Sequence, residues 1–463
     1  LYQIATLVFV GGSLITRGGH NILEPAAYGK AVFVGSYMFN FKEDISYFKG
    51  NNALIQVSNL DELVEKMVYY LKNRDLLKEK GNLARELLVK NQGALFKNTK
   101  GINYLLTRKP KILLLRLSAI GDVIHALPTA YAVRKRYPAA EINWLVEDRV
   151  AGLVALNHYI DNIIVMPRSK WKGLFKKNKW RALKLIFSFL KELKHYNFDI
   201  VVDLHGMFKS ALPIGMMKTA KRFGRADARE GSTLFYTDKI EIPAELTHKI
   251  DRNLYLAEKA LGVDIKEIEY GINPGTLEKE NVDKLLSEYQ LLNKKFIVIN
   301  PFTTWKTKNW PIEHYTELAA KIIDTLDYVV IFTGGKKDRV EIEANLKGIS
   351  SSAYNFAGNT NLRELAELYQ RAELYIGGDT GPMHLAVAVS LPVIAIMGPT
   401  DPEEFGPYGN KNIILQDKDL NCINCWKRRC KNNHQCMNNI TVEQVFRAVQ
   451  KQLEVSGNVG DGK

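Results

Sequence analysis

The sequence has few cysteines and no long hydrophobic run. Only 4 of its 463 residues are cysteine, all between Cys422 and Cys436, so a disulfide framework spanning the chain is excluded. Apolar runs such as 112–115 and 392–397 are far shorter than the roughly 18 residues that a membrane-spanning helix needs. Acidic residues are also scarce: 50 Asp and Glu stand against 64 Lys and Arg, a net charge of +14. This excess favours an anionic partner, namely nucleic acid, an anionic membrane or a phosphorylated ligand.

The rest of the composition is that of an ordinary globular protein, with 46% apolar and 25% charged residues. Short apolar runs that end in Gly-rich turns alternate with helical stretches, which predicts an α/β protein with parallel sheets. The polar segment 91–109 indicates a linker with a domain boundary near 108, and the charge-rich stretch 278–295 indicates a second boundary near 290. The chain opens on Leu1 within an expected strand, with no export signal, and we expect its natural N-terminus to lie upstream.

A weak internal repeat relates the segments 8–35 and 374–398. Each contains an apolar strand, Gly-Gly, a loop with another Gly, a His, an Ala-containing helix and a strand that ends in Gly. We interpret the two segments as related strand–loop–helix–strand units. The alternative is a coincidence between two ordinary βαβ pieces.

The segment 377–382 (GGDTGP) stands between an expected strand and an expected helix. Glycine lets the backbone approach a ligand closely, and Pro382 suits a first helical turn. The free N–H groups and the positive end of that helix suit a diphosphate, to which Thr380 and His384 add donors. Alternatively, the segment is a structural turn capped by Asp379.

Two other loops follow expected strands. After the strand 111–116, Asp122 stands at the mouth of the sheet, where a carboxylate can act as general base on a substrate hydroxyl. Asp122 is otherwise a helix N-cap. The loop 301–311 places Lys306 and Lys308 between two Trp residues, where a cation can neutralise a departing diphosphate. Both lysines are otherwise solvated surface residues.

Three motifs together carry a family resemblance: SAIGDVIHALP at 118–128, TTWKTKNWP at 303–311 and GGDTGPMHLA at 377–386. In this order they are similar to the motifs of the lipopolysaccharide heptosyltransferases of glycosyltransferase family nine, over about 109–449. The segment 225–236, followed by His248 and Arg252, most resembles members that add the first heptose to Kdo-lipid A, where Kdo is 3-deoxy-D-manno-octulosonic acid.

The resemblance implies a GT-B architecture with two Rossmann-like domains, an acceptor domain at 109–290 and an ADP-heptose-binding domain at 291–455, followed by a tail at 456–463. It implies inverting transfer of L-glycero-D-manno-heptose from ADP-heptose to the Kdo of Kdo-lipid A, at the cytoplasmic face of the inner membrane. Asp122 is the implied catalytic base. The implied diphosphate-binding residues are Thr303, Lys308, Gly378, Asp379, Thr380, Gly381 and His384. The implied acceptor-binding residues are Ser118, Gly121, His125, Arg225 and Arg229.

Two further features of the family bear on this sequence. An acidic residue contacts ribose or adenosine in many members, and both Asp338 and Glu341 are candidates for that role here. The only Asp-x-Asp pattern is Asp417-Lys-Asp419, in a polar loop late in the chain, so no catalytic metal is expected.

The first 107 residues resemble a different family. The segment 9–41 is similar to the C-terminal part of the nucleotide-sugar domain of Kdo transferase, and by that resemblance a CMP-Kdo-type loop contains Gly19, His20, Asn21 and Glu24. The acceptor domain and catalytic carboxylate of that family are missing from the sequence. We therefore expect a partial Rossmann-like domain that is inactive alone, in a chain that is part of a Kdo transferase–heptosyltransferase fusion.

The cysteines form the pattern Cys422-x2-Cys425-x4-Cys430-x5-Cys436. This close spacing is typical of thiolates that bind a metal, and we expect a structural zinc. The alternatives are free thiols in a C-terminal loop or, less consistent with reduced cytoplasmic thiols, disulfides.

From 168 to 194 the chain has ten Lys or Arg and one acidic residue, Glu192, interleaved with aromatic residues. Such a segment suits peripheral contact with an anionic membrane surface. A solvated helix with a basic outer face is the alternative.

Functions outside this family remain to be weighed. One is transfer of another nucleotide sugar to another glycolipid; the other is a non-catalytic nucleotide- or nucleic-acid-binding protein. The basic residues cluster beside the glycosyltransferase motifs, and the cysteine spacing lacks the helix of a C2H2 zinc finger, so no nucleic acid is expected as a partner.

Overall fold

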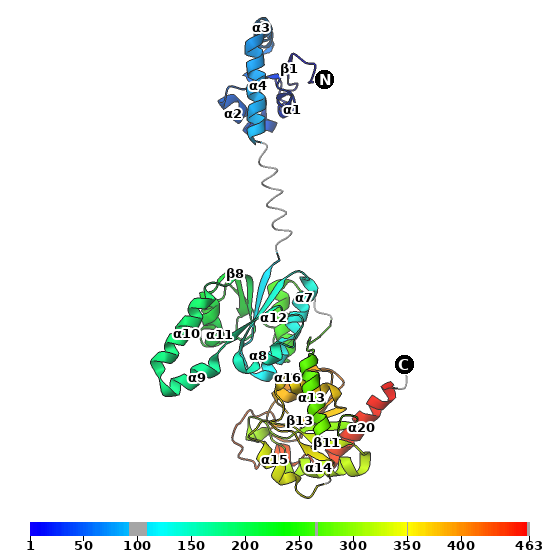
Figure 1. Ribbon diagram of the computed structural model, residues 1–463. Coiled ribbons are helices and arrows are strands. Elements are labelled where there is room, and N and C mark those ends of the chain that lie inside the picture. Colours follow the sequence, from blue (N-terminus) through cyan, green and yellow to red (C-terminus); the bar gives the residue numbers. More distant parts are fainter. Residues whose placement is uncertain (92–108, 264–266, 350, 461–463) are drawn as a thin grey trace. The chain divides into compact units, whose positions relative to one another are not determined.

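The computed structural model describes residues 1–91, 109–263, 267–349 and 351–460 (Figure 1). The chain divides into two compact units, Leu1–Arg108 and Lys109–Lys463. All but the ends of the linker expected at 91–109 lie outside the described residues.

The first unit contains a parallel sheet in the order β1-β2-β3. Its strands are β1 (Leu7–Phe9), β2 (Ala31–Val34) and β3 (Ile55–Gln56), and its helices are α1 (Leu23–Ala27), η1 (Phe39–Phe41), α2 (Lys42–Gly50), α3 (Leu60–Lys72) and α4 (Arg74–Asn91). Strand β2 is buried on both faces: Val32 and Val34 join one apolar cluster, while Ala31 and Phe33 join another. Covered faces on both sides explain why its sequence is a continuous apolar run.

The second unit contains two six-stranded parallel sheets. The first has the order β6-β5-β4-β7-β8-β9, with β4 (Lys111–Leu115), β5 (Glu141–Glu147), β6 (Asn162–Met166), β7 (Asn197–Asp203), β8 (Lys218–Arg225) and β9 (Asp238–Ile240). Its helices are α6 (Ile120–Ala126), α7 (Pro128–Arg136), α8 (Asp148–Val154), α9 (Arg168–Lys177), α10 (Lys179–Leu193), α11 (Phe208–Met216), η2 (Ser232–Phe235) and α12 (Lys249–Leu261).

The second sheet has the order β12-β11-β10-β13-β14-β15, with β10 (Phe296–Asn300), β11 (Val329–Phe332), β12 (Ala353–Asn355), β13 (Leu374–Gly378), β14 (Val393–Ile396) and β15 (Ile413–Leu415). Its helices are α13 (Thr276–Glu288), η3 (Lys306–Lys308), α14 (Ile312–Leu326), α15 (Arg339–Leu346), α16 (Leu362–Arg371), α17 (Gly381–Ala388), α18 (Pro402–Phe405), α19 (Gln435–Asn438) and α20 (Val442–Gly460).

Both sheets reverse their strand order at their centre, between β4 and β7 and between β10 and β13. Ligands of open α/β sheets bind at the carboxyl ends of the strands at such a switch point. All three motifs of the family resemblance follow one of these four strands, so the topology brings them to the two crevices.

Helix α13, which precedes the boundary expected near 290, packs on α16 of the second sheet. Asp283 pairs with Arg371 at 2.5 Å, and Glu278, which is buried, pairs with Arg363 at 2.7 Å. The charged residues that suggested a linker are therefore fixed by ion pairs to a neighbouring helix.

The expected tail at 456–463 needs correction, because α20 continues to Gly460 (Figure 1). Residues 461–463 lie outside the described residues. At 19 residues α20 is the longest helix of the described parts, yet neither it nor any other helix there is long and apolar enough to span a membrane.

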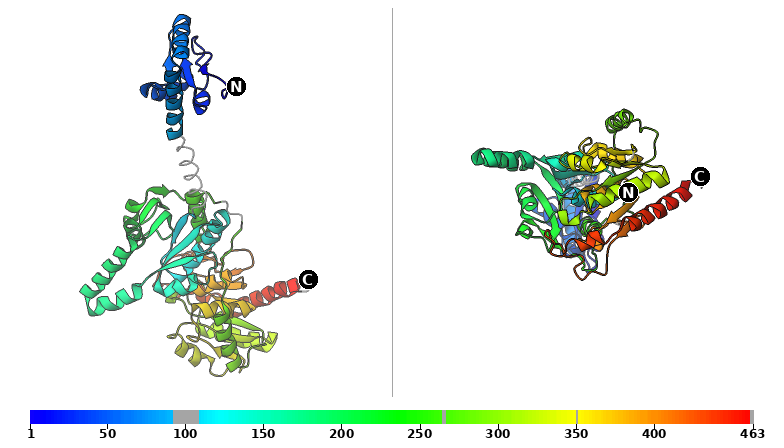
Figure 2. Two further views of the ribbon diagram at one scale, coloured as in Figure 1. Left: turned by 45° about the horizontal axis from the view of Figure 1, so that its top comes forward. Right: turned by 90° about the horizontal axis from the view of Figure 1, so that it is seen from below.

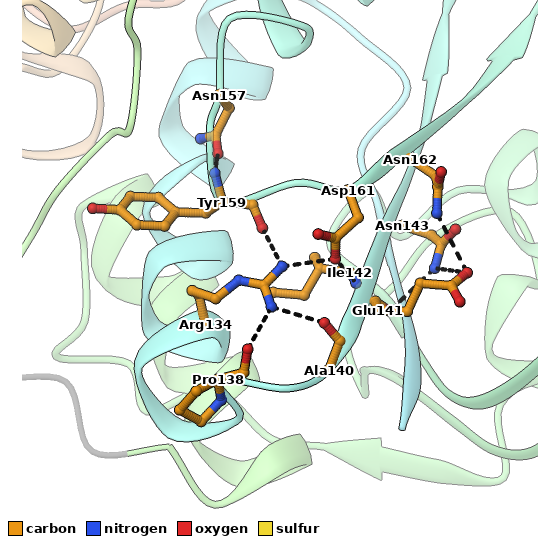
Figure 3. Close-up of polar contacts among 10 residues, drawn as sticks. All are labelled: Arg134, Pro138, Ala140, Glu141, Ile142, Asn143, Asn157, Tyr159, Asp161 and Asn162. Atoms are coloured by element: carbon orange, nitrogen blue, oxygen red, sulfur yellow. Dashed lines mark hydrogen bonds and ion pairs between the residues drawn. The ribbon is translucent and has the colours of Figure 1, made fainter. Parts of the chain in front are cut away.

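Arg134 ties the end of α7 to the β5–β6 edge of the first sheet (Figure 3). Its guanidinium donates to the carbonyls of Pro138, Ala140 and Tyr159 at 3.0, 2.8 and 3.1 Å and pairs with Asp161 at 2.7 Å. The same Asp161 oxygen accepts from the Ile142 N–H. The Arg134 side chain thus supplies hydrogen-bond donors to three loop carbonyls next to this edge of the sheet.

Candidate functional site

A cationic pocket lies at the carboxyl ends of β4, β7 and β8. Five cationic side chains and one carboxylate, Asp122, line it, together with polar and small residues; the full lining is Arg116, Asp122, His125, His205, Gly206, Met207, Arg225, Arg229, Lys249, Arg252 and Asn253. This charge balance suits an anionic ligand.

Asp122 lies in the first turn of α6 and is held by two partners. Its Oδ1 pairs with Arg116 Nη2 at 2.8 Å, and its Oδ2 accepts from the Ala119 N–H at 3.2 Å. Burial raises the pKa of Asp122, but the Arg116 charge and the Ala119 N–H outweigh burial, so the pKa lies below its usual value. The side chain is 33% exposed, and an ionised carboxylate therefore faces the pocket. Ala119 is the N-cap of α6, so the alternative that Asp122 is the N-cap is wrong. Asp122 nevertheless accepts a hydrogen bond from the Ala119 N–H.

The loop after β7 brings His205 to the pocket. The buried carboxylate of Asp203 shapes this loop, because Oδ1 accepts from the backbone N–H groups of His205 and Gly206 at 2.8 and 3.1 Å. Burial, followed by the charges of Arg116 and Lys209, lowers the pKa of His205 to about 2, so its ring is neutral. Both ring nitrogens are buried, and neither has a hydrogen-bond partner among the described residues.

Arg225 and Arg252 are held in the pocket by one shared carboxylate. Asp227 pairs with Arg225 Nε at 3.3 Å and with Arg252 Nη2 at 3.0 Å. One turn before Arg252 on α12, Lys249 pairs with Glu404 at 2.5 Å. The cations are therefore positioned before any ligand binds, which reduces the entropic cost of binding.

Ser118 and Glu147 form a network beside the pocket. Ser118 Oγ donates to Glu147 Oε1 at 3.2 Å and accepts from Lys209 Nζ at 3.0 Å. Arg168, at the start of α9, also reaches Glu147, at 3.5 Å. The Ser118 hydroxyl thus anchors its own loop.

The residues that the resemblance implies for diphosphate binding lie at the carboxyl ends of β10 and β13. Lys308 in η3 pairs with Asp379, just after β13, at 2.6 Å, and lies over the ring of Trp305 at 4.6 Å from its centroid. Burial raises the pKa of Asp379, but His384 and Lys308 outweigh burial and lower that pKa to about 2. Thr380, not Asp379, is the N-cap of α17, so the capping interpretation of Asp379 is wrong. Lys308 is likewise partly buried and paired rather than solvated, while Lys306 is exposed.

Thr303 and Gly378 lie against each other beside this ion pair. Thr303 Oγ1 donates to the Trp305 carbonyl at 2.7 Å and accepts from the Trp305 N–H at 3.1 Å. A Cβ on Gly378 would lie 3.2 Å from the Thr303 methyl group, so glycine lets the two loops meet.

Two glycines of the motifs bring the crevices together. A Cβ on Gly121 would lie 2.8 Å from His384 Cδ2, and a Cβ on Gly381 would lie 2.8 Å from Ile120 Cβ. Glycine at both positions therefore permits α6 and α17 to pack closely.

His125 and His384 form the polar centre of that contact. His125 Nε2 lies 3.0 Å from His384 Nδ1, and His384 Nε2 lies 3.6 Å from Asp379 Oδ1. Burial, then the nearby His384 and His248, holds the pKa of His125 well below its usual value, so its ring is neutral. His125 thus joins the two halves of the site as well as lining the pocket.

The remaining expectations fall outside this joined site. Asp338 Oδ2 accepts from the Gly335 N–H at 2.8 Å and closes the loop after β11, whereas Glu341 is exposed on α15. In the first unit Asn21 caps α1 through the Leu23 N–H at 2.9 Å, and His20 and Glu24 are exposed. Gly19 has a φ of +70°, which favours glycine there.

The four cysteines lie apart from this site, and the structural zinc expected there stays a prediction. No three His, Cys, Asp or Glu side chains in the described parts of the chain lie so as to hold a metal ion. Cys430 Sγ instead accepts from the N–H groups of Asn432 and His434 at 3.3 and 3.4 Å, and Cys422 Sγ accepts from the Asn432 amide. Burial, then the other three thiols, raises the pKa of Cys436 to about 11.

Sequence reasoning missed six pocket residues: Arg116, His205, Gly206, Met207, Lys249 and Asn253. Arg116 carried a signal, because a charge at the end of a buried apolar strand is unusual. His205 carried one as well, because it follows a second buried strand of the same sheet. Lys249 and Asn253 reach the pocket from α12, and no local pattern marked them.

Comparisons with known proteins agree with this geometry. The family model of glycosyltransferase family 9 (heptosyltransferase) matches residues 186–435. The lipopolysaccharide core heptosyltransferase OpsX of Haemophilus influenzae is 30% identical over 315 residues, which are 67% of this chain and 86% of OpsX.

Solved structures share the fold. A family 9 glycosyltransferase from Veillonella parvula matches with a TM-score of 0.65 at 22% identity, over 74% of this chain and 97% of that one. The Escherichia coli heptosyltransferase WaaC, solved with ADP-2-deoxy-2-fluoro heptose, matches with a TM-score of 0.59 at 22% identity, over 74% of this chain and 99% of WaaC.

Two Rossmann-like halves, each an open parallel sheet, together with the match to solved heptosyltransferase structures define a GT-B glycosyltransferase fold, and the expected fold class is confirmed. The chain belongs to glycosyltransferase family 9, the heptosyltransferases. It is therefore an enzyme rather than a non-catalytic binding protein.

Proposed function

We propose that the chain transfers L-glycero-D-manno-heptose from ADP-heptose to the Kdo of Kdo-lipid A, with inversion, in lipopolysaccharide inner-core biosynthesis. The observation that carries this proposal is the ionised Asp122 in a pocket lined by five cations. Kdo is a carboxylated sugar on a phosphorylated lipid, so such a pocket complements it. OpsX acts on the lipopolysaccharide core by its name, and WaaC was solved with a heptose nucleotide analogue, which supports the same donor and acceptor classes here.

The reaction is a single displacement. Asp122 accepts the proton of the Kdo hydroxyl as that oxygen forms a bond to the anomeric carbon of the heptose. The bond from that carbon to the diphosphate oxygen breaks, and its electron pair leaves with ADP. Arg116 and the Ala119 N–H keep the Asp122 carboxylate aimed into the pocket.

The leaving diphosphate gains negative charge as its bond breaks. Lys308 and the N-terminus of α17 supply positive charge at that place, with Asp379 orienting Lys308. His384 holds Asp379 on its other oxygen. The proposed mechanism uses no metal.

The first unit is proposed to be part of a Kdo transferase region that is inactive alone. Its parallel three-stranded sheet and the loop at Gly19 support a partial nucleotide-sugar domain. Incubation of the chain with CMP-Kdo and lipid A should yield no Kdo transfer, and measurable transfer would contradict this part of the proposal.

Mass spectrometry of the lipid product tests the donor and acceptor together. With ADP-heptose, Kdo-lipid A should gain the mass of one heptose, whereas lipid A without Kdo should gain none. UDP-glucose and UDP-N-acetylglucosamine serve as matched alternative donors. Efficient transfer from either, or addition to lipid A without Kdo, would overturn the proposal in favour of another glycolipid pathway.

A further inference from the structure

Helices α9 and α10 form an arm on the first sheet of the Lys109–Lys463 unit. In all three views the pair projects from the body of that unit (Figures 1 and 2). The inner face of the arm is already packed: the rings of Trp171 and Phe189 lie 5.4 Å apart, and Ala182 and Leu193 are fully buried. Packing of the fold therefore accounts for the apolar residues of that face.

The outer face of α10 carries apolar residues that contact with the core does not explain. Trp180 is 82% exposed, Phe187 69% and Leu183 37%. They stand at positions i, i+3 and i+7, so they form one stripe along the helix. Phe175, at the end of α9, is a further exposed aromatic, at 39%. Large aromatic side chains in such a stripe are costly to leave in water.

Basic residues flank this stripe. On α10 they are Arg181, Lys184 and Lys191, all exposed, and they lie within about a quarter turn of the stripe at 100° per residue. The turn from α9 to α10 adds Lys176, Lys177 and Lys179. Glu192 is the one acidic residue from 168 to 194. An apolar stripe edged by cations is the pattern of a helix that lies in a membrane interface.

We infer that the α9–α10 arm docks on an anionic phospholipid bilayer, with Trp180, Leu183 and Phe187 inserted among the acyl chains and the lysines at the phosphates. Charge complementarity identifies this partner, because the cations attract anionic headgroups while their aliphatic stems follow the apolar surface. Nucleic acid fits less well, since Leu183 lies in the same stripe and cannot stack on a base.

The arm begins next to the candidate active site. Arg168, the first residue of α9, pairs with Glu147, and Glu147 holds the Ser118 hydroxyl at the start of the loop that carries Asp122. Docking of the arm would thus bring the acceptor pocket close to the headgroup layer. This consequence rests on the proposed function, whereas the docking itself is measured without it.

Vesicle co-sedimentation tests the inference on the full chain. Binding is compared between vesicles of phosphatidylethanolamine with phosphatidylglycerol and vesicles of phosphatidylcholine alone. The triple variant Trp180→Ser, Leu183→Ser, Phe187→Ser should bind the anionic vesicles roughly tenfold or more weakly. The matched control is Leu234→Ser with Val340→Ser, residues that are 84% and 78% exposed elsewhere in the same unit. The control should bind as the unmodified chain does.

Two further comparisons complete the test. Lys176→Glu with Lys184→Glu should abolish the preference for anionic vesicles, and circular dichroism with thermal unfolding must show that each variant is folded. Equal vesicle binding by the folded triple variant overturns the inference. The inference is also overturned if the stripe mediates binding to RNA, or if the unmodified chain is a dimer and the triple variant is a monomer. In either case the stripe would serve another partner.

Failure of the two proposals is distinguishable. Heptose transfer to detergent-dispersed Kdo-lipid A with no vesicle binding overturns the docking inference alone. Stripe-dependent vesicle binding with no heptose transfer overturns the proposed function alone.

Discussion

The imidazole of His125 on α6 lies 3.0 Å from that of His384 on α17, and this contact joins residues 259 positions apart. His125 follows Asp122 by one helical turn, and His384 reaches Asp379 at 3.6 Å. The contact therefore brings α6, which carries Asp122, against α17, whose His384 lies beside the Lys308–Asp379 ion pair. Both histidines are buried, so the link is shielded from water.

Buried neutral histidines predict that acid destabilises the protein. The pKa of His205 is about 2 in the folded chain, against about 6.5 when unfolded, so between these values the unfolded chain binds more protons. The free energy of unfolding is therefore not reduced by His205 above about pH 6.5. As the pH falls from 7 to 5, protonation of His205 in the unfolded chain lowers the free energy of unfolding by about 2 kcal/mol. Burial also lowers the pKa values of His125 and His248, which adds loss in the same direction.

Urea unfolding at pH 7 and pH 5 measures this loss. His205→Asn should remove about 2 kcal/mol of the difference, whereas the exposed His195→Asn should leave the difference unchanged. A pH dependence that is identical with and without the His205 ring would contradict this, because it would show that the ring gains its proton over the same pH range in the folded and the unfolded chain.

Substitution of Asp122 should remove the proton acceptor. We expect Asp122→Ala to lower kcat by about 10² or more, while ADP-heptose still binds, because the donor contacts lie on the second sheet. Steady-state kinetics and calorimetric titration of the donor check the two halves of this expectation. Retained turnover would assign the base to another residue.

Lys308 and Lys306 offer a matched pair in one loop. Lys308→Ala should lower kcat/KM for ADP-heptose by about 10² to 10³, because it removes the cation at the leaving diphosphate. Lys306→Ala removes an exposed cation two residues away and should leave kcat/KM almost unchanged. Equal losses in both variants would indicate a general effect of loop charge.

The cysteine segment keeps its metal hypothesis as a prediction. The spacing predicts about one zinc per chain, which would require the thiols of Cys422, Cys425, Cys430 and Cys436 to rearrange from their present contacts. Metal analysis of protein purified without chelators measures the zinc content, and Cys422→Ser with Cys425→Ser should abolish it. Zinc at background level in the unmodified protein would establish four free thiols.

Much of the architecture could be predicted because it is local. Buried parallel strands are continuous apolar runs, such as KILLL at 111–115 and VIAI at 393–396, and the Gly-rich loops after them mark the strand ends. Asp122, Lys308 and Asp379 could therefore be assigned to the mouths of the two sheets.

What could not be predicted depends on distant partners. Helix α13 is charged because it pairs with α16, whose residues Arg363 and Arg371 lie far along the chain. The pocket cation Lys249 arrives from α12, and the packing of Gly121 against His384 appears only when two separate sheets face each other.

Release of ADP from ADP-heptose tests the central claim most directly. The purified chain should release ADP at a rate that depends on added Kdo-lipid A, with only a low rate from lipid A without Kdo, and Asp122→Ala should abolish the dependence. Folded protein that releases no ADP with Kdo-lipid A, or releases it equally without any acceptor, would contradict heptose transfer to Kdo.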